Sequence, residues 1–345
     1  MPGSPTDNLW VILVDFNGID DTRKCLDSLA GQPTPPRTVV VDNASRTDVA
    51  AALAAEFPWA SFVRSSVNGG WAGGNNLGMK FALERGADLM ILLNNDTTVA
   101  PDFVDRLRAA AASHPDYGVL GPVIRYMAPP CEVQTDGVRF NHPSEPGFFQ
   151  RHPVALDRRD PPVVAEVDIV NGCCLMVRRG VVEKIGYVDE QFFLIHEESD
   201  FCLRTQRAGF RNGVVAEALV WHKGSSTFKR EGKGFQRYFD ARNLVRLLKR
   251  HGRRRGSRGL IPSFAHYLRY AYHRFATERE SGFDASATAV LEGFYDALLG
   301  RYGPHSEASR PGLGVLRWVF STAWKWGGGR VTATSSGPVR TTPPG

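Results

Sequence analysis

The stretch Leu89-Met90-Ile91-Leu92-Leu93-Asn94-Asn95-Asp96 decides the fold, because an apolar run ends there in a polar triplet. An uninterrupted apolar run of this length is typical of a strand that is buried on both faces of a parallel sheet. Such a strand delivers the polar triplet to the carboxyl edge of the sheet, where α/β proteins bind ligands and hard cations. The stretch therefore predicts an α/β protein with a binding crevice at that edge.

The rest of the chain alternates predicted strands with predicted helices. We expect strands at 10–16, 38–41, 61–64, 89–93, 167–177 and 214–222, and helices at 20–30, 48–57, 75–85, 102–113, 181–185, 197–208 and 234–251. Strands joined through helices pair in parallel, with right-handed crossovers. The expected fold is one mostly parallel central sheet flanked by helices, with a long excursion between Cys131 and Pro162.

Composition divides the 345 residues into four segments. Residues 1–7 and 327–345 are rich in Gly, Pro, Ser and Thr, and we expect both to be disordered. Residues 8–251 are expected to form the sheet domain, and residues 252–326 a helical C-terminal extension. The longest apolar runs, of about five residues, are far shorter than the ~20 needed to cross a bilayer, so we expect no membrane span.

Cysteine content and charge bear on compartment and partners. The five cysteines are odd in number and show no CxxC spacing or secretory leader, which favours a reducing cytoplasm. Much of the formal charge of +6 lies in a basic cluster between Arg246 and Arg258. This cluster could bind anionic lipid, a pyrophosphate or nucleic acid, or it could be a solvated helix end. Because no RNA- or DNA-binding module accompanies it, we expect no nucleic-acid partner.

Three polar motifs follow three separate predicted strands: Asp15-Phe16-Asn17-Gly18, Asp42-Asn43-Ala44-Ser45 and Asn94-Asn95-Asp96. One crevice can receive all three. Asp42 could accept the imide N–H of uracil or thymine, or it could form an Asx turn. The glycine-rich stretch 68–78 could let the backbone approach a phosphate or ribose ahead of a helix, or its glycines could serve packing.

A second polar cluster, His196-Glu197-Glu198-Ser199-Asp200, places three carboxylates within four residues. Such crowding raises at least one pKa toward the range of a general base, although acids also favour helix N-termini. Asp96 offers an anionic oxygen to a metal ion, unless its triplet is a plain turn. His222 follows Trp221 at a strand end and could be a manganese ligand or a structural histidine.

Six motifs in this order resemble those of the family 2 glycosyltransferases, and are most similar to the rhamnosyltransferase-like branch. They are 16–18 (Phe-Asn-Gly), 39–45 (Val-Val-Val-Asp-Asn-Ala-Ser), 68–78 (Asn-Gly-Gly-Trp-Ala-Gly-Gly-Asn-Asn-Leu-Gly), 93–96 (Leu-Asn-Asn-Asp), 196–200 (His-Glu-Glu-Ser-Asp) and 221–224 (Trp-His-Lys-Gly). The resemblance spans residues 9–251. It implies the GT-A fold, a nucleotide-sugar donor, a divalent metal (Mg or Mn) and inversion at the anomeric carbon.

The resemblance also implies roles for individual residues. Glu198 matches the acid that deprotonates the acceptor hydroxyl, although the family has Asp there; Asp200 is the fallback, with Glu197 beside them. Asp96 and His222 would hold the metal, while Asn94 stands where the family's DxD element has its first acid. The implied substrate-binding residues are Asp15, Asn17, Asp42, Asn43, Asn68, Gly69, Gly74, Asn75, Asn94, Asn95, Gly172 and Trp221.

The expected activity is transfer of a sugar, with rhamnose as a candidate, from a UDP- or dTDP-sugar to a hydroxyl of a glycan, a lipid-linked glycan or a small glycoside. One alternative is a sugar-1-phosphate nucleotidyltransferase, which would carry a basic glycine-rich loop where 17–21 reads Asn-Gly-Ile-Asp-Asp. Another is a non-catalytic protein that binds a membrane surface or nucleic acid on the same scaffold. Residues 313–326 combine tryptophans with cations, as in an interfacial helix at the inner face of the cell membrane, or form a packed helix.

Overall fold

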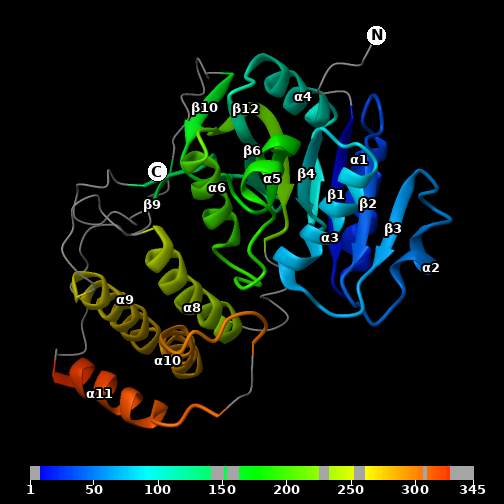
Figure 1. Ribbon diagram of the computed structural model, residues 1–345. Coiled ribbons are helices and arrows are strands. Elements are labelled where there is room, and N and C mark those ends of the chain that lie inside the picture. Colours follow the sequence, from blue (N-terminus) through cyan, green and yellow to red (C-terminus); the bar gives the residue numbers. More distant parts are fainter. Residues whose placement is uncertain are drawn as a thin grey trace, which may run out of the picture. The chain divides into compact units, whose positions relative to one another are not determined.

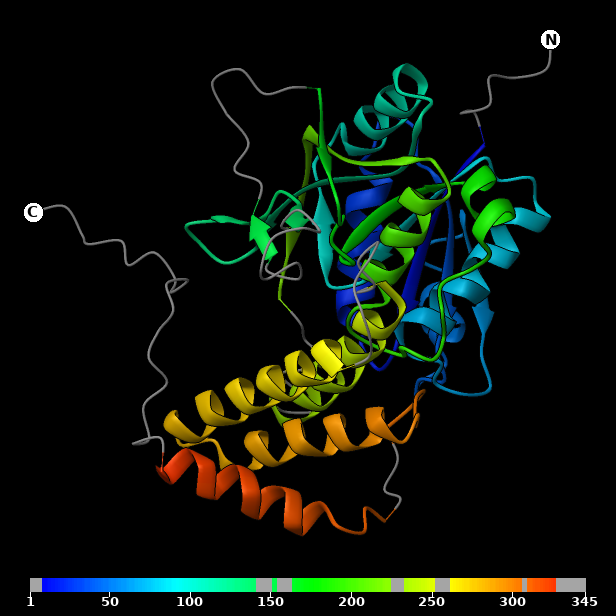
Figure 2. The same ribbon diagram turned by 60° about the vertical axis from the view of Figure 1, so that its left-hand side comes forward.

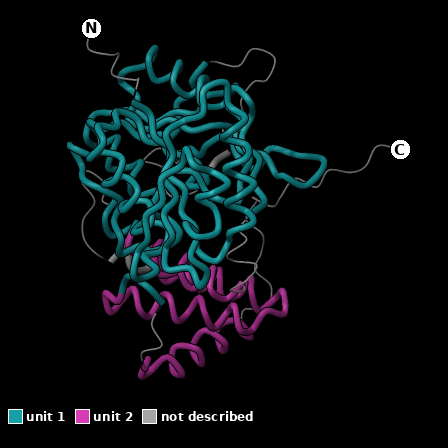
Figure 3. Tube along the Cα trace, turned by 90° about the vertical axis from the view of Figure 1, so that its right-hand side faces the viewer, with its two compact units in different colours: residues 1–230, 247–257, 302–306 teal, residues 231–246, 258–301, 307–345 magenta. Residues whose placement is uncertain are grey.

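The computed structural model describes residues 8–140, 151–153, 163–224, 233–251, 261–305 and 309–326. The chain divides into two compact units (Figure 3). The sheet unit comprises residues 1–230, 247–257 and 302–306, and the helical unit comprises 231–246, 258–301 and 307–345. The two segments expected to be disordered, 1–7 and 327–345, lie outside the described residues.

A ten-stranded sheet forms the centre of the sheet unit (Figure 1). Its strands lie in the order β10 (Val164–Val167), β12 (Arg211–His222), β6 (Tyr117–Tyr126), β11 (Cys174–Arg178), β4 (Leu89–Asn94), β1 (Leu9–Asp15), β2 (Arg37–Asp42) and β3 (Ala60–Arg64). Two short strands pair at its side, β5 (Thr97–Val99) with β12 and β7 (Val133–Thr135) with β6. A separate hairpin pairs β8 (Val138–Phe140) with β9 (Arg151–Pro153).

The predicted α/β fold, with a central sheet flanked by helices, is confirmed. Strands β4, β1, β2 and β3 pair in parallel, as does β6 with β12, whereas β11 runs antiparallel to both of its neighbours. The predicted strand at 167–177 is wrong, because the chain turns between β10 and β11. Asn171 makes this turn: its Oδ1 accepts a hydrogen bond from the backbone N–H of Cys173 at 2.9 Å.

Strand β6 was not predicted, because Gly118, Gly121 and Pro122 are typical strand breakers. In the structure these glycines sit where neighbours press closely on the sheet. A Cβ atom at Gly121 would lie only 2.2 Å from Cγ1 of Val170. Glycine is therefore required in this buried strand for packing, which local sequence patterns do not reveal.

Helices cover both faces of the sheet (Figure 1). On one face lie α1 (Ile19–Ala30), α2 (Val49–Leu53) and α4 (Phe103–Ser113). On the other lie α3 (Gly70–Glu84), α5 (Arg179–Ile185) and α6 (Glu197–Arg207). Strand β1 supplies both cores, because its alternate side chains point to opposite faces: Val11 and Leu13 to the first, Trp10 and Ile12 to the second.

Helix α3 begins at Gly70, five residues before its predicted start at Asn75, so most of the glycine-rich stretch is helical rather than an open loop. Its glycines allow the helix to approach β1. A Cβ atom at Gly78 would lie 2.3 Å from Cγ2 of Ile12, and one at Gly74 would lie 2.5 Å from Cγ1 of Val14. For these two positions the packing interpretation is the correct one.

The helical unit contains α9 (Ile261–Glu280), α10 (Asp284–Leu298) and α11 (Leu313–Trp326), which run side by side (Figure 2). Helix α8 (Lys233–His251) contributes residues to both units. In the helical unit, Asp296 is buried and accepts hydrogen bonds from Tyr238 and Arg310, each at 2.7 Å. Among the described residues, no helix is both long enough and apolar enough to cross a bilayer.

The close packing of α3 on β1 can be tested with two alanine substitutions in the same helix. We expect Gly78→Ala to lower the free energy of unfolding by about 1–3 kcal/mol, because the new methyl group overlaps Ile12. Gly73→Ala is the matched control, since its Cβ would have no neighbour closer than 3.9 Å. It should stabilise the helix by up to about 1 kcal/mol. Urea denaturation measures both, and equal effects of the two substitutions would contradict the packing argument.

Candidate functional site

The carboxylate of Asp15, at the end of β1, joins helix α1 to the loops that follow β2 and β4. Its Oδ2 accepts a hydrogen bond from the Thr22 hydroxyl at 2.6 Å, and its Oδ1 accepts one from the Ser45 hydroxyl at 2.7 Å. The amide of Asn95, which follows β4, donates to Oδ2 at 3.4 Å and to Thr22 at 2.8 Å. Asp15 is fully buried. This position favours a role in holding the loops over direct contact with a substrate.

Asn17 completes this arrangement from the loop after β1. It has a positive φ of 56°, which asparagine tolerates better than most residues. Its backbone N–H donates to the Ser45 hydroxyl at 2.9 Å, and its side-chain oxygen accepts from the Arg46 N–H at 2.8 Å. The three strand-end motifs predicted to share one crevice therefore do lie together.

Asp42, at the end of β2, forms the Asx turn that the sequence also allowed. Its Oδ1 accepts a hydrogen bond from the Ser45 N–H at 2.7 Å, and its Oδ2 pairs with the Arg64 guanidinium at 2.9 Å. Arg64 was missed in the sequence analysis. It ends β3 directly opposite Asp42 in the parallel register, so only the strand pairing could have revealed it.

The side chain of Asn43 forms hydrogen bonds to the residues at the start of α3. Its side-chain amide donates to Asn68 Oδ1 and to the Gly70 carbonyl, each at 3.0 Å, while its Oδ1 accepts from the Gly69 N–H at 3.0 Å. Gly70 has a φ of +67°, and a Cβ there would lie 2.3 Å from the Phe193 carbonyl oxygen. The backbone at 68–70 is thus fixed from two sides.

Three further side chains of α3 are tied to this edge. Trp71 donates its indole N–H to Asn94 Oδ1 at 3.0 Å, so the side-chain oxygen of Asn94 is engaged by the protein. Asn75 donates to the Trp71 carbonyl at 2.9 Å, and its own side-chain oxygen is buried without a hydrogen-bond partner. Asn76, which was not predicted, donates to Glu190 at 2.9 Å and so anchors the loop before α6.

Asp96 and His222 meet where β5 pairs with the end of β12. Nε2 of His222 lies 3.2 Å from Asp96 Oδ1, yet it forms no hydrogen bond of acceptable geometry. The other ring nitrogen, Nδ1, contacts Oε1 of Gln134 on β7 at 3.0 Å. An amide oxygen only accepts hydrogen bonds, so Nδ1 donates to Gln134. In the neutral imidazole, Nε2 then presents its lone pair toward the carboxylate.

Two acceptors facing each other in a buried position are stabilised when a cation joins them. Asp96 and His222 are each about 5–6% exposed, and carboxylate oxygen with imidazole nitrogen suits manganese or a similar ion. A metal-binding histidine usually donates its other ring N–H to an oxygen acceptor. Gln134 is that acceptor for His222. Across the described ranges, no group of three His, Cys, Asp or Glu side chains is arranged for a metal, so the chain would supply these two.

Lys223 adds a positive charge beside this pair and was not predicted. Its backbone N–H donates to the Asp96 carbonyl at 3.0 Å, and its ammonium group pairs with Asp21 at 2.8 Å. The hydrogen bond to Asp21 raises the pKa of Lys223. Trp221, on the other side of His222, is half-buried and packs against the core beneath the sheet.

Glu198 lies over the turn that leads into β11. A Cβ at Gly172 would sit 3.5 Å from Cβ of Glu198, and the next residue, Cys173, accepts a hydrogen bond from the Asn94 N–H at 2.9 Å. The turn therefore connects the start of α6 to the polar triplet after β4. Glu198 is half-buried, and its Oε1 accepts from the Ser199 hydroxyl at 2.9 Å.

The two neighbouring acids have different surroundings. Asp200 is fully buried, where it pairs with Arg204 and His251 at 2.8 Å and with Arg250 at 3.1 Å. Burial alone would raise the pKa of Asp200, but the hydrogen bond from His251 and the charge of Arg204 outweigh it and lower that pKa. Burial raises the pKa of Glu197 well above its ordinary value, and the charge of Glu198 adds to this. Of the three acids, Glu198 is thus the one that keeps partial access to water.

The loop before α6 has a strained backbone. Phe193, Ile195 and His196 have φ values of 64°, 68° and 72°. A β-branched residue such as Ile195 rarely adopts this conformation, and such strain gathers at functional sites. The strain supports a functional role for the acids that immediately follow.

The adjacent cysteines are packed in the core. Cys173 and Cys174 are buried, and burial raises the pKa of each thiol well above its ordinary value.

The basic cluster between Arg246 and Arg258 is only partly described, because residues 252–258 lie outside the described ranges. Within it, Arg250 forms ion pairs with Asp189 and Asp200 in the sheet unit, so this cation is not a free ligand site.

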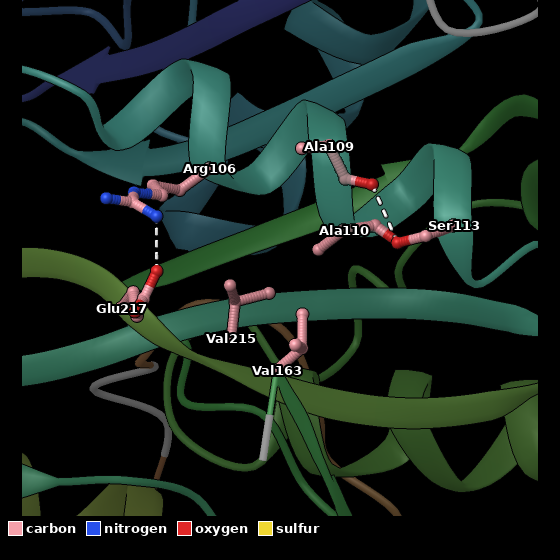
Figure 4. A pocket seen from close by; sticks show the side chains of 7 residues that line it. All are labelled: Arg106, Ala109, Ala110, Ser113, Val163, Val215 and Glu217. Atoms are coloured by element: carbon pink, nitrogen blue, oxygen red, sulfur yellow. Dashed lines mark hydrogen bonds and ion pairs between the residues drawn. The ribbon is translucent and has the colours of Figure 1, made fainter. Parts of the chain in front are cut away.

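A small hollow of about 120 Å³ lies elsewhere, between α4 and β12 (Figure 4). It is lined by Arg106, Ala109, Ala110, Ser113, Val163, Val215 and Glu217. Arg106 and Glu217 pair across it, and Ser113 donates to the Ala109 carbonyl. Its polar groups therefore satisfy one another, and none of the strand-end motifs reaches it.

The fold is one that glycosyltransferases have. The chain belongs to glycosyl transferase family 2, whose family model, Glycosyl transferase family 2, matches residues 10–186. The match covers the strand-end motifs of the first half, from β1 through the turn at Gly172. This confirms the predicted family and excludes the nucleotidyltransferase alternative.

Relatives and a solved structure agree. A low-salt glycan biosynthesis hexosyltransferase of Haloferax volcanii is 26% identical, over 69% of this chain and 74% of that protein. An N-acetylglucosaminyl-diphospho-decaprenol L-rhamnosyltransferase of Mycobacterium tuberculosis is 27% identical, over 64% of this chain and 78% of that protein. The crystal structure of GalNAc-T7 with UDP, GalNAc and Mn²⁺ matches 70% of this chain with a TM-score of 0.55 and 14% identity. This chain spans about half (47%) of that one.

The ion-pair cluster around Asp200 gives a stability prediction. Asp200→Asn should lower the free energy of unfolding at neutral pH by about 3–5 kcal/mol, because it leaves the largely buried Arg204 guanidinium without its ionic partner. The more exposed Asp189→Asn, which removes one ion pair of Arg250, should cost about 0–1 kcal/mol. Because the folded pKa of Asp200 is lowered, its contribution is complete above the unfolded pKa near 3.9 and is lost as the pH falls below it.

Chemical denaturation at neutral pH and at acidic pH measures the contribution of Asp200 to the free energy of unfolding. The difference between the parent protein and Asp200→Asn should shrink as the pH falls below about 4. A difference that is small at neutral pH, or constant with pH, would show that Asp200 is not the ionised centre of the cluster.

Proposed function

We propose that this glycosyltransferase uses a divalent metal and inverts the anomeric carbon as it moves a sugar from a UDP- or dTDP-sugar to an acceptor hydroxyl. The observation that carries the proposal is the pair formed by Asp96 and His222, in which the buried imidazole nitrogen Nε2 lies 3.2 Å from a carboxylate oxygen and makes no hydrogen bond. Lys223 lies beside this pair, and the half-buried carboxylate of Glu198, at the start of α6, lies over the turn at Gly172. This combination provides for both leaving-group and acceptor chemistry.

Asp96 and His222 would hold the metal, with Gln134 fixing the imidazole tautomer and Asn94 remaining tied to Trp71. A bound Mg²⁺ or Mn²⁺ supplies electrostatic stabilisation of the negative charge that develops on a leaving diphosphate. Lys223 can add to this stabilisation if it exchanges Asp21 for a phosphate oxygen, because both partners are anionic oxygens. The donor diphosphate and water would supply the other ligands of such a metal.

We assign the role of general base to Glu198. It is half-buried, whereas Asp200 is fully buried and ion-paired and Glu197 is buried with a raised pKa. A single base that deprotonates the acceptor hydroxyl suits one direct displacement, and direct displacement inverts the anomeric carbon. The small residue Gly172 beneath Glu198 leaves room for the reacting groups.

For the donor, we propose that the nucleobase binds against the turn that starts at Asp42, beside Arg64, and that the ribose lies near the backbone held by Asn43 and Asn68. Support comes from the paired strand ends that bring these groups to one edge. Uracil and thymine present the same imide edge, so both UDP- and dTDP-sugars fit this proposal. The Mycobacterium tuberculosis relative, a rhamnosyltransferase, favours rhamnose.

For the acceptor, we propose a hydroxyl of a glycan that is carried on a lipid, with free glycans and small glycosides as alternatives. The same relative is named for a diphospho-decaprenol acceptor, and the Haloferax volcanii relative for glycan biosynthesis. All five cysteines are free thiols, which suits the cytoplasm and the inner face of the cell membrane as the place of action.

The metal proposal predicts that Asp96→Ala loses both Mn²⁺ binding and, by orders of magnitude, turnover. Excess chelator should abolish the activity of the parent protein. Asn94→Asp is the control, because it keeps the oxygen that accepts from Trp71. Mn²⁺ affinity can be followed by electron paramagnetic resonance and turnover by release of nucleoside diphosphate from a donor panel.

Gln134→Leu should weaken Mn²⁺ binding by about 10- to 100-fold, because it removes the hydrogen bond that holds the imidazole of His222. Full activity in excess EDTA would refute the proposal.

The base assignment predicts that Glu198→Gln lowers turnover by roughly 10²-fold or more, because the amide cannot accept the proton. The variant keeps the oxygen that accepts from Ser199, so donor affinity should be unchanged in calorimetry. Glu197→Gln is the comparison and should lose much less. If Asp200→Asn were inactive while folded, and Glu198→Gln active, the base would be Asp200.

A further inference from the structure

Helix α11 has apolar side chains on two opposite faces. Its inner face packs in the helical unit: Phe320 is only 4% exposed, and its ring centroid lies 5.9 Å from Tyr272 and 5.7 Å from Phe275 on α9. Trp324, one turn further on, lies under the Arg279 guanidinium at 5.2 Å. The inner face of α11 is therefore covered by α9.

The opposite face, which we call the outer face, consists of Val315, Trp318, Val319 and Trp326. Their spacing of three, four and seven residues places them in one stripe. They are 65%, 67%, 46% and 88% exposed. Four of the eleven large apolar side chains exposed in the described part of the chain are thus gathered on 14 residues. An exposed cluster of this kind marks a surface for interaction.

The charges on α11 indicate which kind of partner it fits. Its only charged residues are Arg317 and Lys325; both are exposed, and the helix contains no acid. Tryptophan prefers the boundary between water and lipid, and cations beside it favour an anionic surface. A symmetric pair of α11 helices from two copies would instead bring like charges together, which is unfavourable.

We propose that the outer face of α11 binds the surface of an anionic phospholipid bilayer. The two tryptophans would enter the headgroup region, while Lys325, seven residues after Trp318 and on the same side of the helix, pairs with lipid phosphates and the exposed Arg317 adds positive charge at the flank. The helix lies on the surface rather than crossing it, because 14 residues at 1.5 Å per residue make only about 21 Å. This membrane contact goes beyond the proposed reaction and does not depend on it, since binding needs neither donor nor acceptor.

The test is co-sedimentation of the full-length chain with vesicles of phosphatidylcholine alone and of phosphatidylcholine with phosphatidylglycerol. We expect the parent protein to bind the anionic vesicles and the double variant Trp318→Ser/Trp326→Ser to bind them at least about tenfold more weakly. Arg317→Gln/Lys325→Gln should reduce the preference for the anionic vesicles. The matched control is Val67→Ser in the sheet unit, because Val67 is as exposed as Trp318, at 67%. It should bind like the parent.

Thermal unfolding by circular dichroism checks that every variant is folded, and all substituted side chains are exposed. Two outcomes would overturn the proposal. The first is equal binding, or none, by the parent and the tryptophan variant. The second is self-association of the parent in sedimentation velocity that the tryptophan substitutions abolish without any vesicle binding, which would make the outer face a contact between copies. Loss of vesicle binding with retained turnover would leave the proposed reaction intact.

Discussion

The buried carboxylate of Asp15 is the contact on which the rest of the site depends. A carboxylate without exposure to water needs hydrogen-bond donors, and here they come from α1, from the loop after β2 and from the loop after β4. Satisfying one buried carboxylate therefore brings helix α1 and the loops after β2 and β4 into one position. The groups that would meet nucleotide and metal are fixed as a consequence.

Three acids on one turn illustrate how position, rather than residue type, decides their chemistry. Glu197 points into the protein and its pKa is raised, while Asp200, one helical turn away, is compensated by cations. Glu198 lies between them in sequence but on the side facing Gly172, and keeps partial access to water. The helix start thus separates a buried acid with a raised pKa, an accessible acid and an ion-paired acid within four residues.

The order of strands and helices could be predicted because apolar runs and their polar ends are local patterns. Strand β6 and the start of α3 were not predicted, because distant partners determine them. Their glycines are needed only because Val170, Ile12 and Val14 press against them. The motif residues could likewise be found, whereas Arg64 depends on the register of β2 and β3, and Gln134 on the pairing of β7. Lys223 directly follows His222 in the sequence, but its ion-pair partner Asp21 is 202 residues away, so the pair could not be predicted.

The cysteines give the molecule a useful chemical asymmetry. Four of the five thiols are buried, and burial raises the pKa of each, which suppresses the reactive thiolate. Cys131 alone is partly accessible, and it lies in the connection between β6 and β7, three residues before Gln134. A maleimide-linked fluorophore or spin label would therefore attach to the natural sequence at one place. That place reports directly on the strand that orients His222.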